Sequence, residues 1–132
     1  MHDTTKEPSG ELAIRTLAMP SDANVNGDIF GGWVISYMDL AGLSIARKRA
    51  KCRVTTVAID KMVFLAPVHV GDFICCYGEL LKVGRTSMTI RIETFASDEL
   101  SGARRCVTEG VFTYVAIDEH GKPIPVISNI SS

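Results

Sequence analysis

The stretch from Asn24 to Asp39, NVNGDIFGGWVISYMD, begins as a polar loop and ends inside the most apolar helical pattern of the sequence. Glycines at positions 27, 31 and 32 mark the junction between the two. A loop that enters a glycine-rich helix start leaves backbone N–H groups without partners, in front of the positive end of the helix dipole. Such a junction can accept a phosphate or a developing oxyanion. We therefore expect the active site to be built around it.

Asp39 is the unusual residue of this helical pattern, because its neighbours three and four positions away offer no cation: they are Ile35, Ser36, Gly42 and Leu43. A carboxylate among apolar groups needs a hydrogen-bonding partner or a raised pKa. One interpretation is structural, with the carboxylate bonded to the backbone or to a hydroxyl such as that of Ser36. The other is catalytic, with the carboxylate as general base or nucleophile; a positioned base contributes about 10²–10⁴-fold.

The composition is that of one globular domain. The chain has 132 residues, 46% of them hydrophobic and 22% charged, and a net charge of −1, which argues against a nucleic-acid partner. No apolar run approaches the roughly 20 residues of a membrane span, and residues 1–10 do not resemble a signal peptide. The four cysteines show no C-x-x-C spacing, so we expect free thiols and no metal site. Without a membrane span or a signal peptide, we expect a cytoplasmic protein that does not associate with membranes.

Two periodicities predict the secondary structure. Residues from about Phe30 to Lys51 repeat apolar side chains at helical spacing on most sides, which is typical of a buried helix of about five turns. Two-residue alternation and turn signals predict strands over Leu12–Met19, Val54–Leu65, Phe73–Val83, Thr86–Ala96 and Ala103–Ile117. Within the second of these strands, the pattern places four apolar residues on one face: Val57, Ile59, Val63 and Leu65.

These elements predict an α+β fold in which a curved antiparallel sheet wraps one long helix. The predicted strands are longer than the usual five or six residues, which indicates a sheet that curls or continues into a second subunit. A dimer would also protect an unpaired sheet edge.

Further motifs leave alternatives open. Asn24 and the glycines after it can form a plain turn or can bind a carbonyl oxygen or a water, and they match neither dinucleotide nor P-loop patterns. The hairpin Gly84–Ser87 is a simple turn or a ligand contact. The basic run from Arg47 to Arg53 is a solvated helix end or a dock for an anionic group. The three histidines fall in a tail and two turns, which disfavours a histidine-dependent mechanism.

Several segments resemble the acyl-CoA thioesterases of the hotdog fold, YciA type. The resemblance extends from about Leu12 to Pro123, and its most specific part is the long first motif. The segments that carry it are Met19–Trp33 with Met38-Asp39, Cys75–Gly78, Lys82–Ser87 and Phe112–Ala116.

The resemblance implies a hotdog domain over residues 11–123, with tails over 1–10 and 124–132 and a sheet of five or six strands. It also implies a homodimer as the minimum unit, assembled further to a tetramer or hexamer. The active sites would lie at the dimer interface, where Asn24 and Asp39 act from opposite subunits. No cofactor is implied beyond the coenzyme A of the substrate.

Together, the residues and the resemblance predict hydrolysis of fatty acyl-CoA to free CoA and a carboxylic acid. The thioester carbonyl would face the N–H groups near Gly31 and Gly32, and Asp39 would activate a water that Asn24 helps to position. Direct attack by Asp39 remains the alternative step, and an acyl-CoA-binding sensor without activity is the alternative function. The expected oxyanion- and substrate-binding residues are Gly31, Gly32, Val57, Ala58, Phe64, Gly84, Arg85, Thr86 and Ser87.

Overall fold

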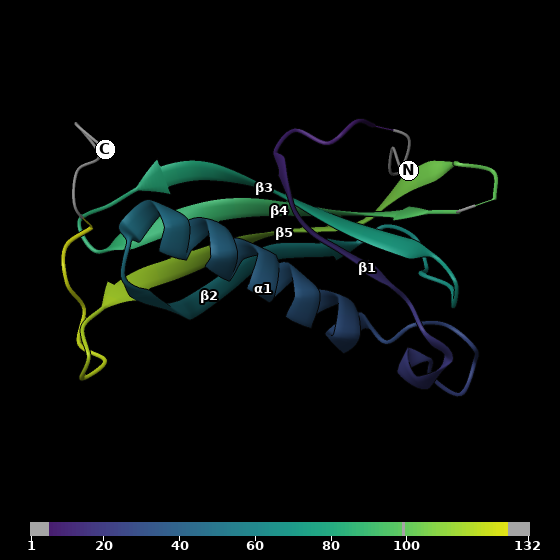
Figure 1. The fold of residues 1–132 in the computed structure, drawn as a ribbon, viewed down its shortest axis with the longest axis horizontal. Helices are drawn as coiled ribbons and strands as arrows, with labels where there is room; N and C mark the ends of the chain where they lie inside the picture. The colour runs from purple at the N-terminus through teal and green to yellow at the C-terminus, as the bar shows by residue number, and fades with distance from the viewer. Residues whose placement is uncertain (1–5, 99, 127–132) are drawn as a thin grey trace.

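A long helix lies against one face of a curved antiparallel sheet (Figure 1). The structure, a computed structural model, describes residues 6–98 and 100–126. Across the described residues, the strand order in the sheet is β1-β3-β4-β5-β2. The elements are β1 (Glu11–Leu17), a short 3-10 helix (Pro20–Asp22), α1 (Gly31–Ala50), β2 (Arg53–Phe64), β3 (Phe73–Val83), β4 (Ser87–Ser97) and β5 (Arg104–Ile117).

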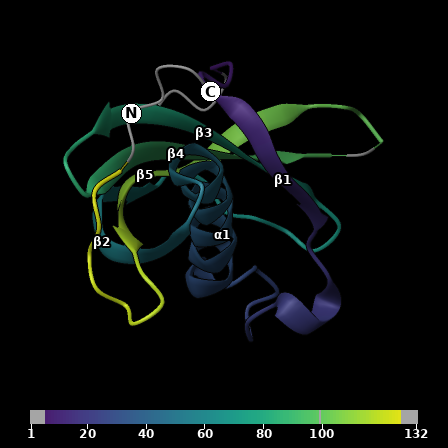
Figure 2. The same ribbon diagram turned by 60° about the vertical axis from the view of Figure 1, so that its left-hand side comes forward.

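Figure 2 shows the sheet arching over α1, with β1 on one side of the helix and β2 on the other. The predicted helix and the five-stranded α+β fold are confirmed, and each predicted strand lies within two residues of an observed one. The helix ends at Ala50. The next residue, Lys51, has a left-handed backbone (φ 58°), and its N–H donates to the carbonyl of Arg47 at 2.7 Å. This closing turn satisfies one of the carbonyls that a helix end leaves free.

The core forms between α1 and the concave face of the sheet. Met38 and Ala41 of α1 are fully buried, as are Met88, Ile90 and Ile92 of β4. The predicted inward alternation of β4 is therefore confirmed, and it presents a continuous apolar surface to the helix. The buried residues of α1 form a single stripe against the sheet, and Leu40 on the other side is 52% exposed. The expectation of a helix buried on most sides is therefore not met within one chain.

Strand β2 does not keep the alternation that the sequence predicts. Its pairing with β5 shifts register between Thr56 and Ala58 and again between Asp60 and Val63. Lys61, inside the second shift, has a left-handed backbone (φ 54°). Each extra residue of a bulge changes which side chains face the core, so the prediction of one shared apolar face for this strand is wrong.

β2 is also an open edge of the sheet. Its only partner among the described strands is β5. Val57, Ile59 and Phe64 are 55%, 43% and 52% exposed along this edge. A long edge strand with exposed apolar side chains is a surface for pairing with another chain.

The convex face of the sheet carries residues that the sequence analysis assigned to the N-terminal tail. The Lys6 ammonium lies 2.8 Å from a carboxylate oxygen of Glu93 and 2.6 Å from one of Glu109. The backbone N–H and the hydroxyl of Ser9 donate to Glu93, each at 3.0 Å. Glu93 points away from the helix, as its place in β4 predicts, yet these contacts leave its side chain only 6% exposed.

Candidate active site

The carboxylate of Asp39 lies near the β2 edge of the sheet, where side chains of β2 and β5 contact it. The hydroxyl of Thr56, on β2, donates to Asp39 Oδ1 at 2.7 Å. The hydroxyl of Tyr114, on β5, lies 3.1 Å from the same oxygen and 2.8 Å from the backbone carbonyl oxygen of Asp39. The Ser36 hydroxyl instead donates to the carbonyl of Trp33 at 2.7 Å, so the partner suggested by the sequence is not the observed one.

Asn24 is fixed by its own loop. Its side-chain oxygen accepts the backbone N–H groups of Asn26 at 2.8 Å and Asp28 at 3.2 Å. Its backbone N–H donates to the carbonyl of Asp28 at 2.7 Å. Because the amide oxygen already accepts two hydrogen bonds in this turn, the amide NH₂ is the group of the Asn24 side chain that remains to contact a ligand, as a donor.

The start of α1 presents free backbone donors. The N–H groups of Trp33 and Val34 both donate to the carbonyl of Phe30, at 3.1 and 3.3 Å. Within the described residues, the N–H groups of Gly31 and Gly32 have no backbone acceptor. Gly32 is exposed. Two adjacent free N–H groups at a helix N-terminus can stabilise negative charge on an oxygen atom.

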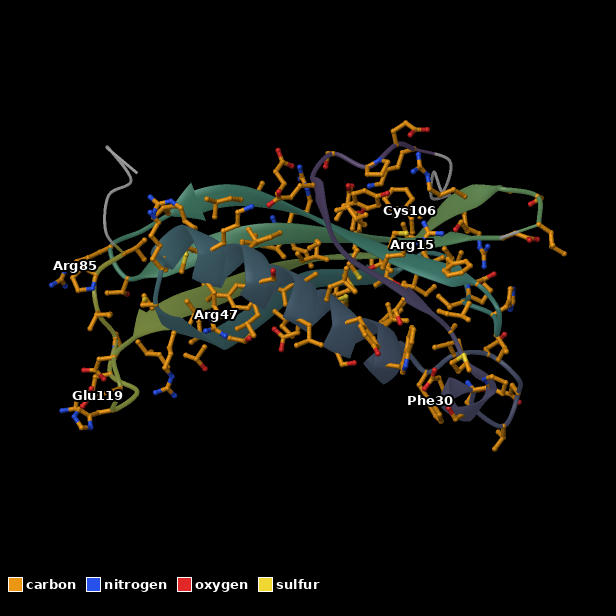
Figure 3. The ribbon with its side chains drawn as sticks, viewed as in Figure 1. Arg15, Phe30, Arg47, Arg85, Cys106 and Glu119 are labelled. Atoms are coloured by element: carbon orange, nitrogen blue, oxygen red, sulfur yellow. The ribbon has the colours of Figure 1, made fainter. Side chains whose placement is uncertain are left out.

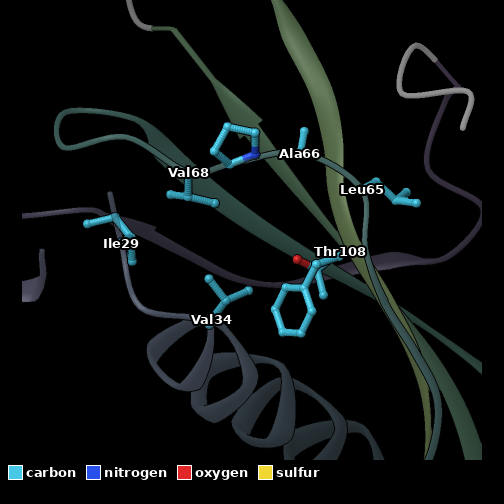
Figure 4. Close-up of a pocket in the computed structure, with 9 residues that line it drawn as sticks. Ile29, Val34, Leu65, Ala66, Val68 and Thr108 are labelled. Atoms are coloured by element: carbon cyan, nitrogen blue, oxygen red, sulfur yellow. The ribbon is translucent and has the colours of Figure 1, made fainter. Parts of the chain in front are cut away.

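A cleft of about 370 Å³ opens beside this helix start (Figure 4). A Cβ at Gly31 would lie 3.1 Å from the ring of Phe64, so a glycine lets the ring approach the helix closely. The cleft is mainly apolar, which suits a hydrocarbon group. It is lined by Ile29, Gly31, Val34, Phe64, Leu65, Ala66, Pro67, Val68 and Thr108.

The turn that carries His69 contacts the loop that carries Asn24, and the sequence analysis did not predict this contact. The Nδ1 atom of His69 lies 3.2 Å from a carboxylate oxygen of Asp28, and the N–H of Ile29 donates to the carbonyl of Val68 at 2.9 Å. Asp72 in turn accepts the backbone N–H of His69, at 2.9 Å. The histidine thus supports the loop from a turn far along the chain, which no local motif signals.

The other predicted binding residues are not all brought together within one subunit. Phe30 and Arg85, which mark the helix start and the hairpin Gly84–Ser87, lie at opposite ends of the molecule (Figure 3). The hairpin is held by backbone bonds, with the Arg85 carbonyl accepting the N–H of Val126 at 2.8 Å and the Thr86 carbonyl accepting that of Ala116 at 2.9 Å. Val57 and Ala58 follow Thr56 on β2, near Asp39 rather than near Gly31.

Thiol and metal chemistry receive no support from the described residues. Burial raises the pKa of Cys76 and of Cys106 to about 11, which keeps both thiols protonated near neutral pH. All four cysteines are free, as predicted. No group of three His, Cys, Asp or Glu side chains in the described ranges has a metal-binding arrangement. Nor does any helix there combine the length and apolarity needed to cross a bilayer.

Comparison with known proteins finds closely similar sequences and structures. Residues 26–103 match the Thioesterase superfamily. The acyl-CoA thioester hydrolase YciA of Salmonella typhimurium is 51% identical over 122 residues, which cover 90% of this chain and 92% of that protein.

Two solved structures share the fold. One is an aspartate-to-alanine mutant of HI0827, described as a hexameric broad specificity acyl-coenzyme A thioesterase; it has a TM-score of 0.90 and 47% identity, covering 94% of this chain and 91% of that one. The other is the hexameric thioesterase y2039 from Yersinia pestis, with a TM-score of 0.89 and 53% identity, covering 92% of this chain and 100% of that one.

Proposed function

We propose that this chain, which belongs to the thioesterase superfamily, hydrolyses acyl-CoA thioesters to free CoA and a carboxylic acid. The observation that carries the proposal is the Asp39 carboxylate, held by Thr56 and Tyr114 at the open edge of the sheet. The names of the similar proteins support the same substrate class.

The proposed reaction needs two groups that lie far apart within one subunit: the N–H donors at the start of α1 and the carboxylate of Asp39. Gly31 and Asp39 are eight residues apart on α1, which corresponds to about 12 Å along the helix axis. Donors to a thioester oxygen must lie about 3 Å from it, and a base must reach the attacking water within a similar distance. A helix start and a carboxylate from the same subunit are therefore poorly placed to serve one carbonyl.

Pairing of two β2 edges about a two-fold axis would solve this. Asp39 contacts Thr56 near one end of β2, while Phe64, at the other end of the strand, packs against Gly31. An antiparallel pair of identical strands places opposite ends side by side. Each Asp39 would then lie near the helix start and Asn24 loop of the partner subunit.

The same two-fold axis gives the hairpin a role. Ser87 pairs with Val115 of β5, at the end of the sheet where β2 begins. In the dimer this end would lie beside the partner's helix start, so the exposed Arg85 can contact the phosphates of coenzyme A. We propose a dimer of this kind as the minimum active unit, and a hexamer as the complete assembly.

In this site the thioester oxygen accepts hydrogen bonds from the N–H groups of Gly31 and Gly32, and the Asn24 amide orients the attacking water molecule. Asp39 of the other subunit takes a proton from that water, and the oxygen forms a bond to the thioester carbon. The tetrahedral intermediate collapses, the carbon–sulfur bond breaks and CoA leaves as the thiolate. Direct attack by Asp39, giving a mixed anhydride that water hydrolyses, is the other route. Either scheme uses protein groups alone.

The test is hydrolysis of a panel of acyl-CoA chain lengths by wild type and Asp39→Asn, followed by detection of free thiol. Asn keeps the shape of Asp but accepts no proton, so we expect kcat to fall about 10²–10⁴-fold while the oligomer stays intact. Glu119→Gln, at an exposed carboxylate, is the matched control and should retain full activity. Near-normal turnover by Asp39→Asn would refute the assignment. Binding of acyl-CoA by wild type without thiol release would favour the alternative of a sensor.

A further inference from the structure

Both hydroxyl contacts of the Asp39 side chain fall on one of its two oxygens. Thr56 Oγ1 lies 2.7 Å from Oδ1 and Tyr114 Oη lies 3.1 Å from it. No described residue donates to Oδ2. An ionised carboxylate has lone pairs on both oxygens, and two donors on the same one leave the other with its full acceptor capacity.

We infer that Tyr114 is a positioning residue for the proposed hydrolysis: with Thr56 it holds Oδ1, so that Oδ2 is the oxygen of Asp39 that reacts. This inference rests on the proposed function and adds to it the identity of the reacting atom. It applies equally to a general base, whose Oδ2 takes the proton of water, and to a nucleophile, whose Oδ2 bonds to the thioester carbon.

The phenol is built to act as a donor. Burial, and then the negative charge of Asp39, raise the pKa of Tyr114 well above its ordinary value, so the hydroxyl keeps its proton across the working pH range. The side chain is fully buried, and its ring stacks on that of Phe112 at a centroid distance of 6.4 Å. A tyrosine packed in this way has one position for its hydroxyl, which a solvent-exposed donor would not have.

The hydroxyl also ties the side chain of Asp39 to the backbone of α1. Tyr114 Oη lies 2.8 Å from the Asp39 carbonyl oxygen, closer than to Oδ1, and its single proton is shared between the two acceptors. The aspartate is therefore located at both its main chain and its carboxylate by one atom of β5. This double contact fixes the direction in which the remaining oxygen points.

The experiment compares Tyr114→Phe, which removes only the hydroxyl, with wild type in kcat, KM and the pH profile of kcat/KM on an acyl-CoA. We expect kcat to fall about 10- to 100-fold with little change in KM, the loss typical of a hydrogen bond to a charged group. The acidic limb of the profile should move to higher pH, because the lost hydrogen bond favoured the ionised form. Tyr77→Phe, on the convex face of the sheet, is the matched control and should leave all three unchanged.

A second pair of variants covers the case in which Tyr114→Phe folds poorly. Thr56→Val removes the other donor to Oδ1, and Thr56→Ser keeps it, so the serine variant should restore kcat and the position of the acidic limb. A kcat and acidic limb unchanged in Tyr114→Phe, or equal losses in Thr56→Val and Thr56→Ser, would overturn the inference.

These outcomes are separable from failure of the proposed function. If Asp39→Asn remains active, the proposed function fails whatever Tyr114 does. If Asp39→Asn is inactive and Tyr114→Phe behaves as wild type, only the inference about Tyr114 and Oδ2 fails.

Discussion

Gly42 shows how closely single residues are fitted around Asp39. A Cβ at this position would lie 2.0 Å from the hydroxyl oxygen of Tyr114, a distance that real Cβ atoms do not adopt. The glycine therefore makes room on α1 for the phenol of β5, and without that room Tyr114 could not reach Asp39. A glycine inside a helix costs about 0.5–1 kcal/mol relative to alanine, so a packing reason is expected for it.

Gly42→Ala should consequently destabilise the fold, although alanine is the better helix former. We expect a loss of about 1–3 kcal/mol in the free energy of unfolding, because the added methyl displaces a packed ring. The loss can be measured by urea unfolding. Gly32→Ala, where an added Cβ meets nothing within 4 Å, should not lose stability in the same experiment. Equal stability of wild type and Gly42→Ala would show that the ring moves without cost.

The residues of the candidate site differ in how far sequence reasoning could find them. The sequence singled out Asp39 as a candidate, because its helical neighbours offer no partner and a carboxylate in an apolar pattern calls for an explanation; in the structure this residue is half-buried. Its partners could not be predicted, since Thr56 and Tyr114 lie 17 and 75 residues away along the chain and only the folded sheet brings them together.

Among the elements, α1 and β4 were predictable because their periods are regular. The bounds of β2 were predicted as well, but not which of its side chains share a face, because two bulges interrupt the alternation. The segment on the convex face of the sheet, residues 6–9, carries an interaction that composition also could not indicate. Although burial alone would raise the pKa of Glu93, the Lys6 ammonium and the donors of Ser9 lower it below the ordinary value of 4.5. Glu93 thus contributes stability above pH 4.5, and this is lost as the pH falls through its lowered value.

Lys6→Met should remove most of this contribution while it keeps an apolar stem. We expect the variant to lose about 1–3 kcal/mol near pH 7, less than a fully buried pair would, because Lys6 is a third exposed. The difference from wild type should shrink as the pH falls through the lowered pKa of Glu93, where its carboxylate becomes protonated. Urea unfolding at several pH values measures it, with the exposed Lys122→Met as control. A difference that stays constant with pH would show that the effect is not one of charge.

For the whole molecule, the wide separation of Asp39 from the helix start argues for sites shared between subunits. The fold class followed from the sequence, and the resemblance already implied shared sites. Which strand would form the contact could not be inferred, because it depends on the strand order, in which β1 and β2 are the two edges. In the dimer that we propose, an open β2 beside Asp39 would place the carboxylate at the boundary between two copies.

Shared sites predict complementation between inactive variants. In a hybrid of Asn24→Ala and Asp39→Asn subunits, one of the two sites carries both changes and the other carries neither. Random exchange should therefore restore about a quarter of the wild-type activity, in line with the isologous symmetry of such a dimer. Mixing the two purified variants under conditions of subunit exchange, followed by thiol detection, measures it. No recovery in verified hybrids would place both residues in the same subunit's site.

The strand order also bears on the route by which the chain reaches its fold. β3, β4 and β5 are neighbours both along the chain and across the sheet, so short hairpins bring them together at small entropic cost. β2 must instead close a long loop to reach β5, and it is also the strand that we assign to the contact between subunits. Both pairings of β2, with β5 inside the chain and with its copy in the proposed dimer, would therefore form after the β3–β4–β5 hairpins, so association of subunits would be a late step.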